Sequence, residues 1–198
     1  MPPGGMTASS TVVAGPLSIV GRIDEHTPVR PIGQSTGRPP DPTAMATTNV
    51  GTIDVYLISP RTDGWRVLTL QRSATTRCPG AWETVHGRIE PGEEPEEAAV
   101  REVREETALA VQRLYNVCVQ PFYLHKTHTV ELAVVFAAFV DPAADIRLSE
   151  EHSRAEWLIP DRALERFVWP RERAALRDIL QLLQGGDAGP VEDVLRVL

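Results

Sequence analysis

An alternation of apolar runs and amphipathic segments, which begins near residue 50, constrains the fold more than any other feature. Residues 53–58 (IDVYLI) and 130–140 (VELAVVFAAFV) are rich in apolar and β-branched side chains and predict buried strands. Shorter strand patterns occupy residues 65–70, 82–85, 111–120 and 155–158, and helical patterns occupy residues 95–107, 161–167 and 171–183. The order predicts an α/β (α+β) fold in which helices cover both faces of a mixed sheet.

The chain divides into three parts by composition. Residues 1–44 hold eight of the 17 prolines and six of the 14 glycines, and they contain no Phe, Trp or Tyr. Such a segment buries too little apolar surface to offset its ordering entropy, so we expect a disordered extension, with a weak strand pattern at 17–23. Residues 45–184 form the expected domain. The last segment, 185–198, begins with two glycines that end a helix, and is a candidate for a short helix or for docking on a second copy in a homodimer.

Charge and composition exclude several classes of protein. The net charge is −7, which argues against binding nucleic acid through a basic surface. No apolar run approaches the roughly 20 residues that a membrane span needs, and the N-terminus lacks the pattern of a signal peptide. Cys78 and Cys118 have no metal-ligand spacing, which is typical of free thiols in a reducing compartment. We therefore expect a cytoplasmic protein with a small-molecule partner.

Acidic residues concentrate around the first predicted helix. Residues 90–106 contain eight glutamates, and Glu102, Glu105 and Glu106 share one helix face because they are spaced i, i+3 and i+4. Like charges repel there, and a hard divalent cation such as Mg²⁺, which prefers oxygen ligands, would relieve the repulsion. The alternative is a solvated acidic face with salt bridges to Arg101. The glycine-rich turn HGRIEPGE that precedes the helix favours a functional site.

Residues 87–109, GRIEPGEEPEEAAVREVREETAL, resemble the Nudix box, G-x5-E-x7-R-E-U-x-E-E-x-G-U with U apolar. The residues at its fixed positions are Gly87, Glu93, Arg101, Glu102, Val103, Glu105, Glu106 and Leu109. Ala108 stands where the box has glycine. A glycine there would serve as a left-handed helix cap, so the departure affects the loop after the helix rather than the carboxylates. The wider resemblance covers roughly residues 50–184.

The resemblance implies a Nudix-type α/β/α sandwich that binds Mg²⁺ or Mn²⁺. Carried over residue by residue, the metal ligands are Glu102, Glu105, Glu106 and the backbone carbonyl of His86. Arg101 would orient Glu102, and Glu93 would support the site from its loop. Metal ions in such a site bridge phosphate oxygens and activate a water for attack on phosphorus.

Further candidates lie outside the box. Glu151 precedes the late strand and is the candidate for an extra metal ligand or a general base, although its neighbours Glu150 and His152 compete for that role. Arg72, at the end of a strand, is a candidate phosphate contact. Weaker candidates for binding the substrate are Arg77, Trp82 and Lys126, of which Trp82 would stack on a base or simply pack in the core.

The substrate class is open at this point. The pattern AWETVHGRIEPGE resembles enzymes that act on (deoxy)nucleoside triphosphates or dihydroneopterin triphosphate, and this gives the leading expectation: a pyrophosphohydrolase. A nucleotide-sugar or dinucleoside-polyphosphate hydrolase is the alternative. Two other classes share the fold: a non-catalytic nucleotide sensor, which usually loses the box carboxylates retained here, and an isoprenoid-diphosphate isomerase, for which Cys78 is the only supporting residue.

Overall fold

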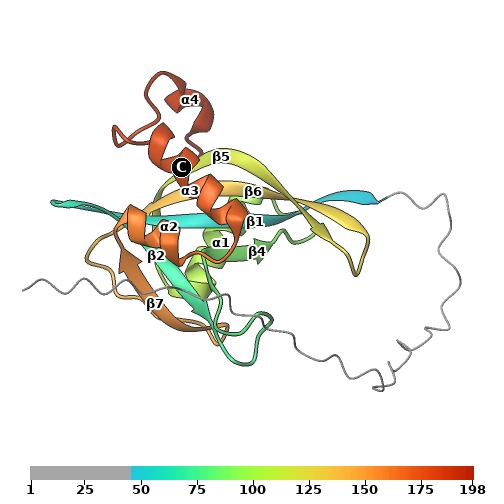
Figure 1. Ribbon diagram of the computed structural model, residues 1–198. Helices are drawn as coiled ribbons and strands as arrows, with labels where there is room; N and C mark the ends of the chain where they lie inside the picture. Colours follow the sequence, from blue (N-terminus) through green and yellow to red (C-terminus); the bar gives the residue numbers. More distant parts are fainter. Residues whose placement is uncertain (1–45) are drawn as a thin grey trace, which may run out of the picture. The chain divides into compact units, whose positions relative to one another are not determined.

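The computed structural model describes residues 46–198 (Figure 1). The extension expected for residues 1–44, with its weak strand pattern, lies outside the described residues.

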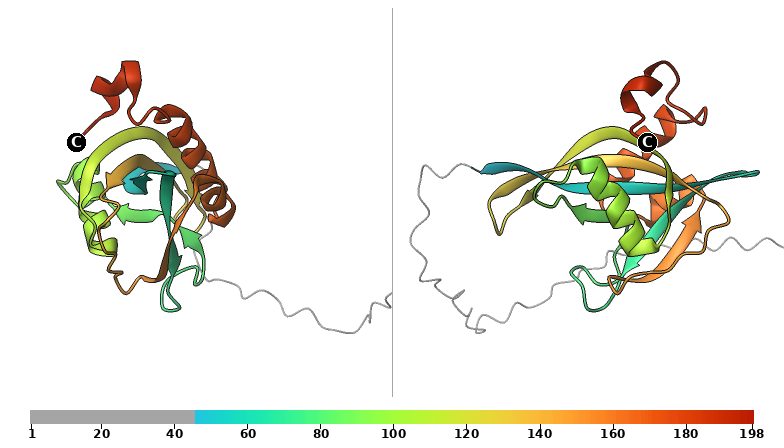
Figure 2. Two further views of the ribbon diagram at one scale, coloured as in Figure 1. Left: turned by 90° about the vertical axis from the view of Figure 1, so that its left-hand side faces the viewer. Right: turned by 180° about the vertical axis from the view of Figure 1, so that it is seen from behind.

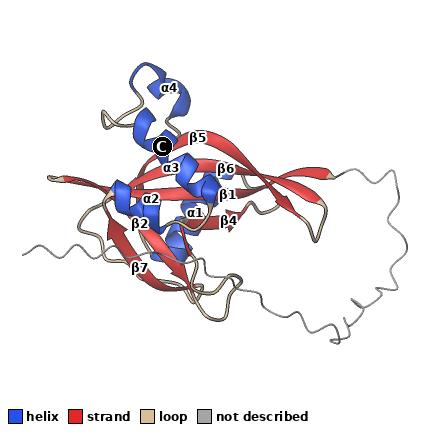
Figure 3. Ribbon diagram, viewed as in Figure 1, coloured by secondary structure: helices blue, strands red, loops and turns tan. Residues whose placement is uncertain are grey.

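A mixed seven-stranded sheet forms the centre of the described part (Figure 3). Its strands are β1 (Thr47–Arg61), β2 (Gly64–Arg72), β3 (Trp82–Glu83), β4 (Val85–Arg88), β5 (Val111–Leu124), β6 (Thr129–Val140) and β7 (His152–Leu158). The main order is β3-β2-β1-β6-β5, with β4 paired to β1 and β7 paired to β2. Only the β1–β6 pairing is parallel among these strands. The mixed sheet predicted from the sequence is confirmed.

Helices cover both faces of this sheet. Helix α1 (Pro95–Thr107) packs on one face, and α2 (Pro160–Arg166) and α3 (Pro170–Leu182) pack on the other (Figure 2). Alternate side chains of β1 serve the two layers, because successive residues of a strand point to opposite faces. Ile53, Val55 and Leu57 join the core beneath α1, whereas Tyr56 and Ile58 join the core beneath α3. The prediction of helices on both faces is confirmed, and α1 has the predicted bounds.

One predicted strand, residues 82–85, is divided in two. Strand β3 pairs with β2, but β4 pairs with β1, so the chain passes from one neighbour to the next at Thr84. The buried Thr84 hydroxyl donates to the Val55 carbonyl at 2.5 Å, and the Thr84 amide donates to the Glu172 carboxylate at 3.3 Å. These two bonds satisfy the buried polar groups where the regular ladder stops.

The C-terminal segment folds back onto the edge of the sheet. It contains a 3₁₀ turn (Gly189–Val191) and the short helix α4 (Glu192–Leu195). The Val197 amide then donates to the Leu114 carbonyl at 2.8 Å, and the Leu114 amide donates to the Leu198 carbonyl at 3.0 Å. No helix in residues 46–198 has both the length and the hydropathy to cross a bilayer.

Candidate active site

The carboxylates of α1 differ in exposure because of how the helix begins and packs. Pro95 occupies the first turn, and Glu94 and Glu97 form a reciprocal capping box at the N-terminus. Ala98, Ala99 and Val103 are buried against the sheet, which fixes the rotation of the helix. As a result, the side chain of Glu106 is 5 % exposed, that of Glu102 is 15 % exposed and that of Glu105 is 60 % exposed.

Strand β4 lies so close to α1 that only glycine fits at position 87. A Cβ atom on Gly87 would lie 2.2 Å from Cγ and 2.4 Å from Cδ of Glu102. The missing side chain lets the Glu102 carboxylate lie against the strand. The preceding residue, His86, belongs to the same strand, and its backbone carbonyl oxygen is the predicted metal ligand from β4.

Arg101 links the turn before α1 to the carboxylates on it. Its Nε and Nη2 donate to the two oxygens of Glu93, at 2.8 and 2.9 Å, and its Nη1 donates to Glu102 at 2.8 Å. Nη2 also donates to the Arg88 carbonyl at 2.8 Å. The hydrogen bonds from Arg101 lower the pKa of Glu93 to about 2. This bidentate bond fixes the guanidinium plane, and with it the position of Glu102.

Glu106 is a buried carboxylate without a counter-ion of its own. Its Oε2 atom has no hydrogen-bond partner among residues 46–198, and Nδ1 of His152 lies 3.7 Å away. Burial raises its pKa to about 9 against an opposing effect of His86, and the charges of Glu102, Glu151 and Glu83 add to the rise. An unneutralised buried carboxylate of this kind is typical of a functional site.

A second group of charges faces Glu106 from β2, β3 and the start of β7. Arg72 donates to Glu83 at 2.6 Å, and its Nη2 lies 3.8 Å from Glu151. The buried His152 ring lies between Glu83, at 3.5 Å, and Glu106. Burial alone would raise the pKa of Glu83, but its contacts with His152, His86 and Arg72 lower it. Glu83 is therefore ionised and tied to Arg72, whereas Glu151, at 58 % exposure, is free to move.

On the far side of β4, the His86 side chain is held between two acidic residues. Its Nδ1 lies 2.6 Å from Asp54, and its Nε2 lies 2.8 Å from Glu172, whose carboxylate is fully buried at the start of α3. Burial alone would lower the pKa of His86, but Glu172 and the nearby carboxylates raise it. Arg171 also pairs with Asp54. The ring of His86 thus ties its strand to both β1 and α3.

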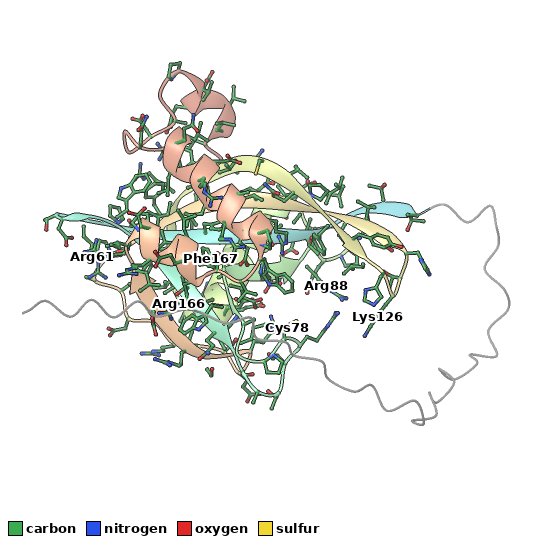
Figure 4. The ribbon with its side chains drawn as sticks, in the orientation of Figure 1. Arg61, Cys78, Arg88, Lys126, Arg166 and Phe167 are labelled. Carbon is green, nitrogen blue, oxygen red and sulfur yellow. The ribbon has the colours of Figure 1, made fainter. Side chains whose placement is uncertain are left out.

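One open pocket of about 960 Å³ connects these groups. Its carboxylate end includes Glu83, Glu102 and Glu151, and its opposite wall comes from β5 and from the start of α3. The charged residues on the lining are Asp54, Arg72, Arg77, Glu83, His86, Arg88, Glu102, His125, Glu151 and Arg171. Figure 4 shows Arg88 and Cys78, which both line the pocket, projecting toward the same side of the molecule.

Six predicted residues line the pocket: Arg72, Arg77, His86, Gly87, Glu102 and Glu151. Glu93, Arg101, Glu105 and Glu106 are not on the lining, and two candidates for binding the substrate also lie elsewhere. Lys126 lies in the turn between β5 and β6 and is not on the pocket lining (Figure 4). Trp82 is also absent from that lining, and its ring instead packs against the guanidinium groups of Arg166, at 4.4 Å, and Arg154, at 5.8 Å. Of the three adjacent candidates before β7, only Glu151 reaches the pocket.

Sequence reasoning missed four residues of this site: Asp54, Glu83, Arg171 and Glu172. Asp54 gave a signal, because it is the only charged residue in the apolar run 53–58, and a buried charge in such a run needs a partner. Glu83 gave a weaker signal of the same kind beside Trp82. Arg171 and Glu172 looked like ordinary polar residues in the first turn of a helix, and nothing local distinguished them.

The donor set fits a hard divalent cation. The carboxylates of Glu102, Glu105 and Glu106 offer oxygen ligands, and the buried Glu106 oxygen without a partner would gain one. As arranged, no three His, Cys, Asp or Glu side chains in the described range converge tightly enough to enclose an ion. Binding would therefore require side chains to turn inward, and the exposed Glu105 and Glu151 have the freedom to do so.

Comparison with known proteins identifies the family. A family model described as "NUDIX domain" matches residues 49–179. An octanoyltransferase from Myxococcus xanthus is 36 % identical over 128 residues, which cover 64 % of this chain but only 35 % of that protein. An asymmetrical bis(5'-nucleosyl)-tetraphosphatase from Rattus norvegicus is 29 % identical over 107 residues, which cover 52 % of this chain and 71 % of that enzyme.

Solved structures agree with this assignment. An Ap4A hydrolase of C. elegans, solved as a binary complex, superposes with a TM-score of 0.58 at 21 % identity and covers 70 % of this chain and 98 % of that one. The E. coli dihydroneopterin triphosphate pyrophosphohydrolase superposes with a TM-score of 0.53 at 26 % identity, over 68 % of this chain and 94 % of that one. With the retained box residues and the mixed sheet, the match to the family model shows that the chain belongs to the Nudix family.

Proposed function

We propose that this protein is an Mg²⁺- or Mn²⁺-dependent pyrophosphohydrolase of nucleoside triphosphates or of dihydroneopterin triphosphate. The observation that carries the proposal is the pocket itself. Its lining holds the carboxylates of Glu83, Glu102 and Glu151, whose charges reach the buried Glu106, together with arginines suited to a polyphosphate. A phosphate chain bridged by metal ions would neutralise both groups at once.

Glu102, Glu105, Glu106, Glu151 and the carbonyl of His86 would hold the metal ions. When bound, the ions supply Lewis-acid activation of the phosphate and of the attacking water. Arg101 positions Glu102 through its bond at 2.8 Å, and Glu93 in turn holds Arg101.

Glu151 is the proposed group that accepts a proton from the attacking water. Its side chain is exposed, lines the pocket and lies 3.8 Å from Arg72. His152 is unsuited to that role because its side chain is 1 % exposed and its ring is enclosed between Glu83 and Glu106.

The arginines of the pocket lining differ in whether they form ion pairs with the described residues. Arg72 is tied to Glu83 and also donates to the Arg77 carbonyl. The side chains of Arg77 and Arg88 form no ion pair with any of residues 46–198. Both therefore remain available for phosphate oxygens, and their position on the lining lets a protein of net charge −7 bind an anion.

Hydrolysis of a substrate panel tests the proposal. Purified protein with Mg²⁺ or Mn²⁺ is incubated with nucleoside triphosphates, dihydroneopterin triphosphate, nucleotide sugars and dinucleoside polyphosphates, and released phosphate and pyrophosphate are measured. The expected result is metal-dependent release of pyrophosphate from a triphosphate, and its loss in a double variant, Glu105→Gln with Glu106→Gln. The matched control is Glu165→Gln, on the exposed face of α2. Binding without turnover of any compound would refute the proposal and favour a nucleotide sensor.

A dinucleoside-polyphosphate hydrolase is the second candidate. The 29 % identity to the rat tetraphosphatase and the openness of the pocket to a long phosphate chain support it. Cleavage of diadenosine tetraphosphate to ATP and AMP, faster than cleavage of any triphosphate in the panel, would favour this candidate.

A further inference from the structure

The pocket wall that comes from β5 and from the start of α3 carries aromatic and apolar side chains. Phe122 and Leu124 line it from β5, and Trp169 lines it from the residue before α3. Trp169 is 38 % exposed although it is a large aromatic side chain. An aromatic wall that stays open to solvent inside a concave site is typical of a surface on which a planar ligand stacks.

Arg171 crosses this end of the pocket in a fixed orientation. Its guanidinium carbon lies 4.8 Å from the centre of the Phe122 ring, and its Nη1 donates to Asp54. Asp54 is itself held by His86 at 2.6 Å. Stacking on one side and an ion pair at one nitrogen define the plane of the guanidinium group.

Arg171 has donors that the described residues leave unused. Its Nε and Nη2 atoms have no hydrogen-bond acceptor among the residues that the structure describes, and 20 % of the side chain is exposed at the lining. A guanidinium group offers only donors, in a rigid planar fork. The group that completes this site must therefore present two adjacent acceptors in one plane.

The ion pairs of the pocket arginines indicate that the acceptors for Arg171 belong to a neutral ring rather than to a phosphate. The charge of Arg171 is already balanced by Asp54, whereas Arg77 and Arg88 form no ion pair with the described residues and serve an anion better. A neutral ligand loses less solvation energy than a phosphate on entering a wall of Phe122 and Trp169.

Thr52 adds an independent observation. It lies two residues before Asp54 on β1, and both residues line the pocket. The Thr52 hydroxyl oxygen is buried and has no hydrogen-bond partner within residues 46–198. A buried polar atom left without a partner beside Asp54 indicates that a ligand completes its hydrogen bonds.

We infer that this end of the pocket binds a heterocycle with a carbonyl oxygen beside a ring-nitrogen acceptor, as in guanine or a pterin, and that Arg171 is the residue that selects it. Guanine presents O6 and N7 to an arginine fork, and a pterin presents its 4-oxo group and N5 in the same way. Adenine places an amino donor where the fork needs an acceptor, so two donors would oppose each other.

The inference rests on the proposed function for its choice of nucleotides, but binding tests it separately from turnover. Titration calorimetry with Mg²⁺ compares the non-hydrolysable α,β-methylene analogues of GTP and ATP. We expect the guanine analogue to bind on the order of tenfold more tightly. Equal binding, or no binding of either compound, overturns the inference. Selective binding without hydrolysis in the substrate panel would support the inference while refuting the proposed function.

Changes in the ligand and in the protein test whether the preference for guanine over adenine comes from Arg171. On the ligand side, 7-deaza-GTP lacks only the N7 acceptor and should compete for the protein several-fold more weakly than GTP. On the protein side, Arg171→Lys keeps the charge beside Asp54 but lacks the fork, so the guanine-to-adenine ratio should fall toward one. Arg162→Lys, at an exposed pair with Glu165, is the control and should keep the wild-type ratio. A preference that persists in Arg171→Lys or with the 7-deaza compound overturns the assignment, and the 7-deaza test applies even if the variant fails to fold.

Discussion

Gly87 and Glu102 are in contact across the gap between β4 and α1, in a way that leaves no room for a Cβ atom. The added carbon would lie 2.2 Å from Glu102 Cγ. A glycine at position 87 therefore leaves space for the Glu102 carboxylate. Substitution of Gly87 tests the position of that carboxylate directly.

Replacing Gly87 by alanine should impair catalysis more than folding. The obstructing atoms belong to a side chain, which can turn aside, so overpacking should cost no more than about 1–3 kcal/mol of unfolding free energy. Turning Glu102 aside, however, displaces a proposed ligand, and we expect kcat/KM to fall by about 10²-fold. Steady-state kinetics and thermal unfolding measure the two effects. Gly185→Ala is the control, because its Cβ would meet nothing within 4 Å. An active Gly87→Ala variant would contradict the role of Glu102.

The raised pKa of Glu106 predicts how stability depends on pH in the absence of metal. A carboxyl whose pKa is about 9 in the folded state and 4.5 when unfolded keeps its proton longer in the folded protein. Its contribution is fully present below pH 4.5 and is lost as the pH rises toward 9. Because one pKa unit corresponds to about 1.4 kcal/mol, Glu106→Gln should remove more than about 1 kcal/mol of this decline. His86 contributes a decline of the same sign, so the comparison of wild type with variant, measured by denaturant unfolding in EDTA, reports Glu106 together with its coupling to His86.

Metal binding should be linked to the same proton. An ion must displace the proton from Glu106, so the apparent affinity for Mg²⁺ or Mn²⁺ should rise with pH up to about 9 and binding should release protons. Calorimetry in buffers of different ionisation enthalpy counts the protons released. Metal affinity that is constant between pH 6 and pH 9 would argue that Glu106 is not a ligand.

Glu172 should be essential to the fold although it lies outside the motif. Its buried carboxylate accepts from His86 at 2.8 Å and from the Thr84 amide at 3.3 Å. Glu172→Gln keeps an acceptor oxygen but removes the charge that pairs with the His86 ring, and should cost about 3 kcal/mol in chemical denaturation. The exposed Glu165→Gln, in a surface pair on α2, should stay within about 0.5 kcal/mol of wild type. Equal stability of the two variants would show that the buried contact contributes little.

The parts of this site that the sequence predicted are the local ones. Glu102, Glu105 and Glu106 share a helix face, and the helix bounds follow from Pro95 and the apolar spacing, so neighbours along the chain were sufficient. The contacts among Asp54, His86 and Glu172 join residues 32 and 86 positions apart. No local pattern specifies which strand packs against which end of a helix. The contacts of His86 with Asp54 and Glu172 therefore require the tertiary arrangement of β1, β4 and α3.

Trp82 is a predicted candidate whose contacts also depend on a distant segment of the chain. An aromatic residue near a glutamate-rich box suggests stacking on a base. The position of its ring depends on Arg166 of α2, which arrives 84 residues later and stacks on it at 4.4 Å. The pocket lining instead includes Phe122 and Trp169, from segments that no sequence pattern associates with the box.

Ala108 provides a last prediction, because the residue keeps the helix cap although its departure from the motif was expected to affect the loop after α1. The residue takes the left-handed conformation of the motif glycine, with φ 60° and ψ 10°, and its amide caps the helix by donating to the Arg104 carbonyl at 2.9 Å. The alanine therefore keeps the glycine's path at a steric cost of about 1 kcal/mol. Ala108→Gly should raise the unfolding free energy by about 0.5–1 kcal/mol, measured by denaturant titration. Ala110→Gly, whose φ is not positive, should not stabilise the protein, since glycine there only adds freedom to the unfolded chain. A stability gain in Ala110→Gly but not in Ala108→Gly would mean that the strain at the helix end is relieved by other means.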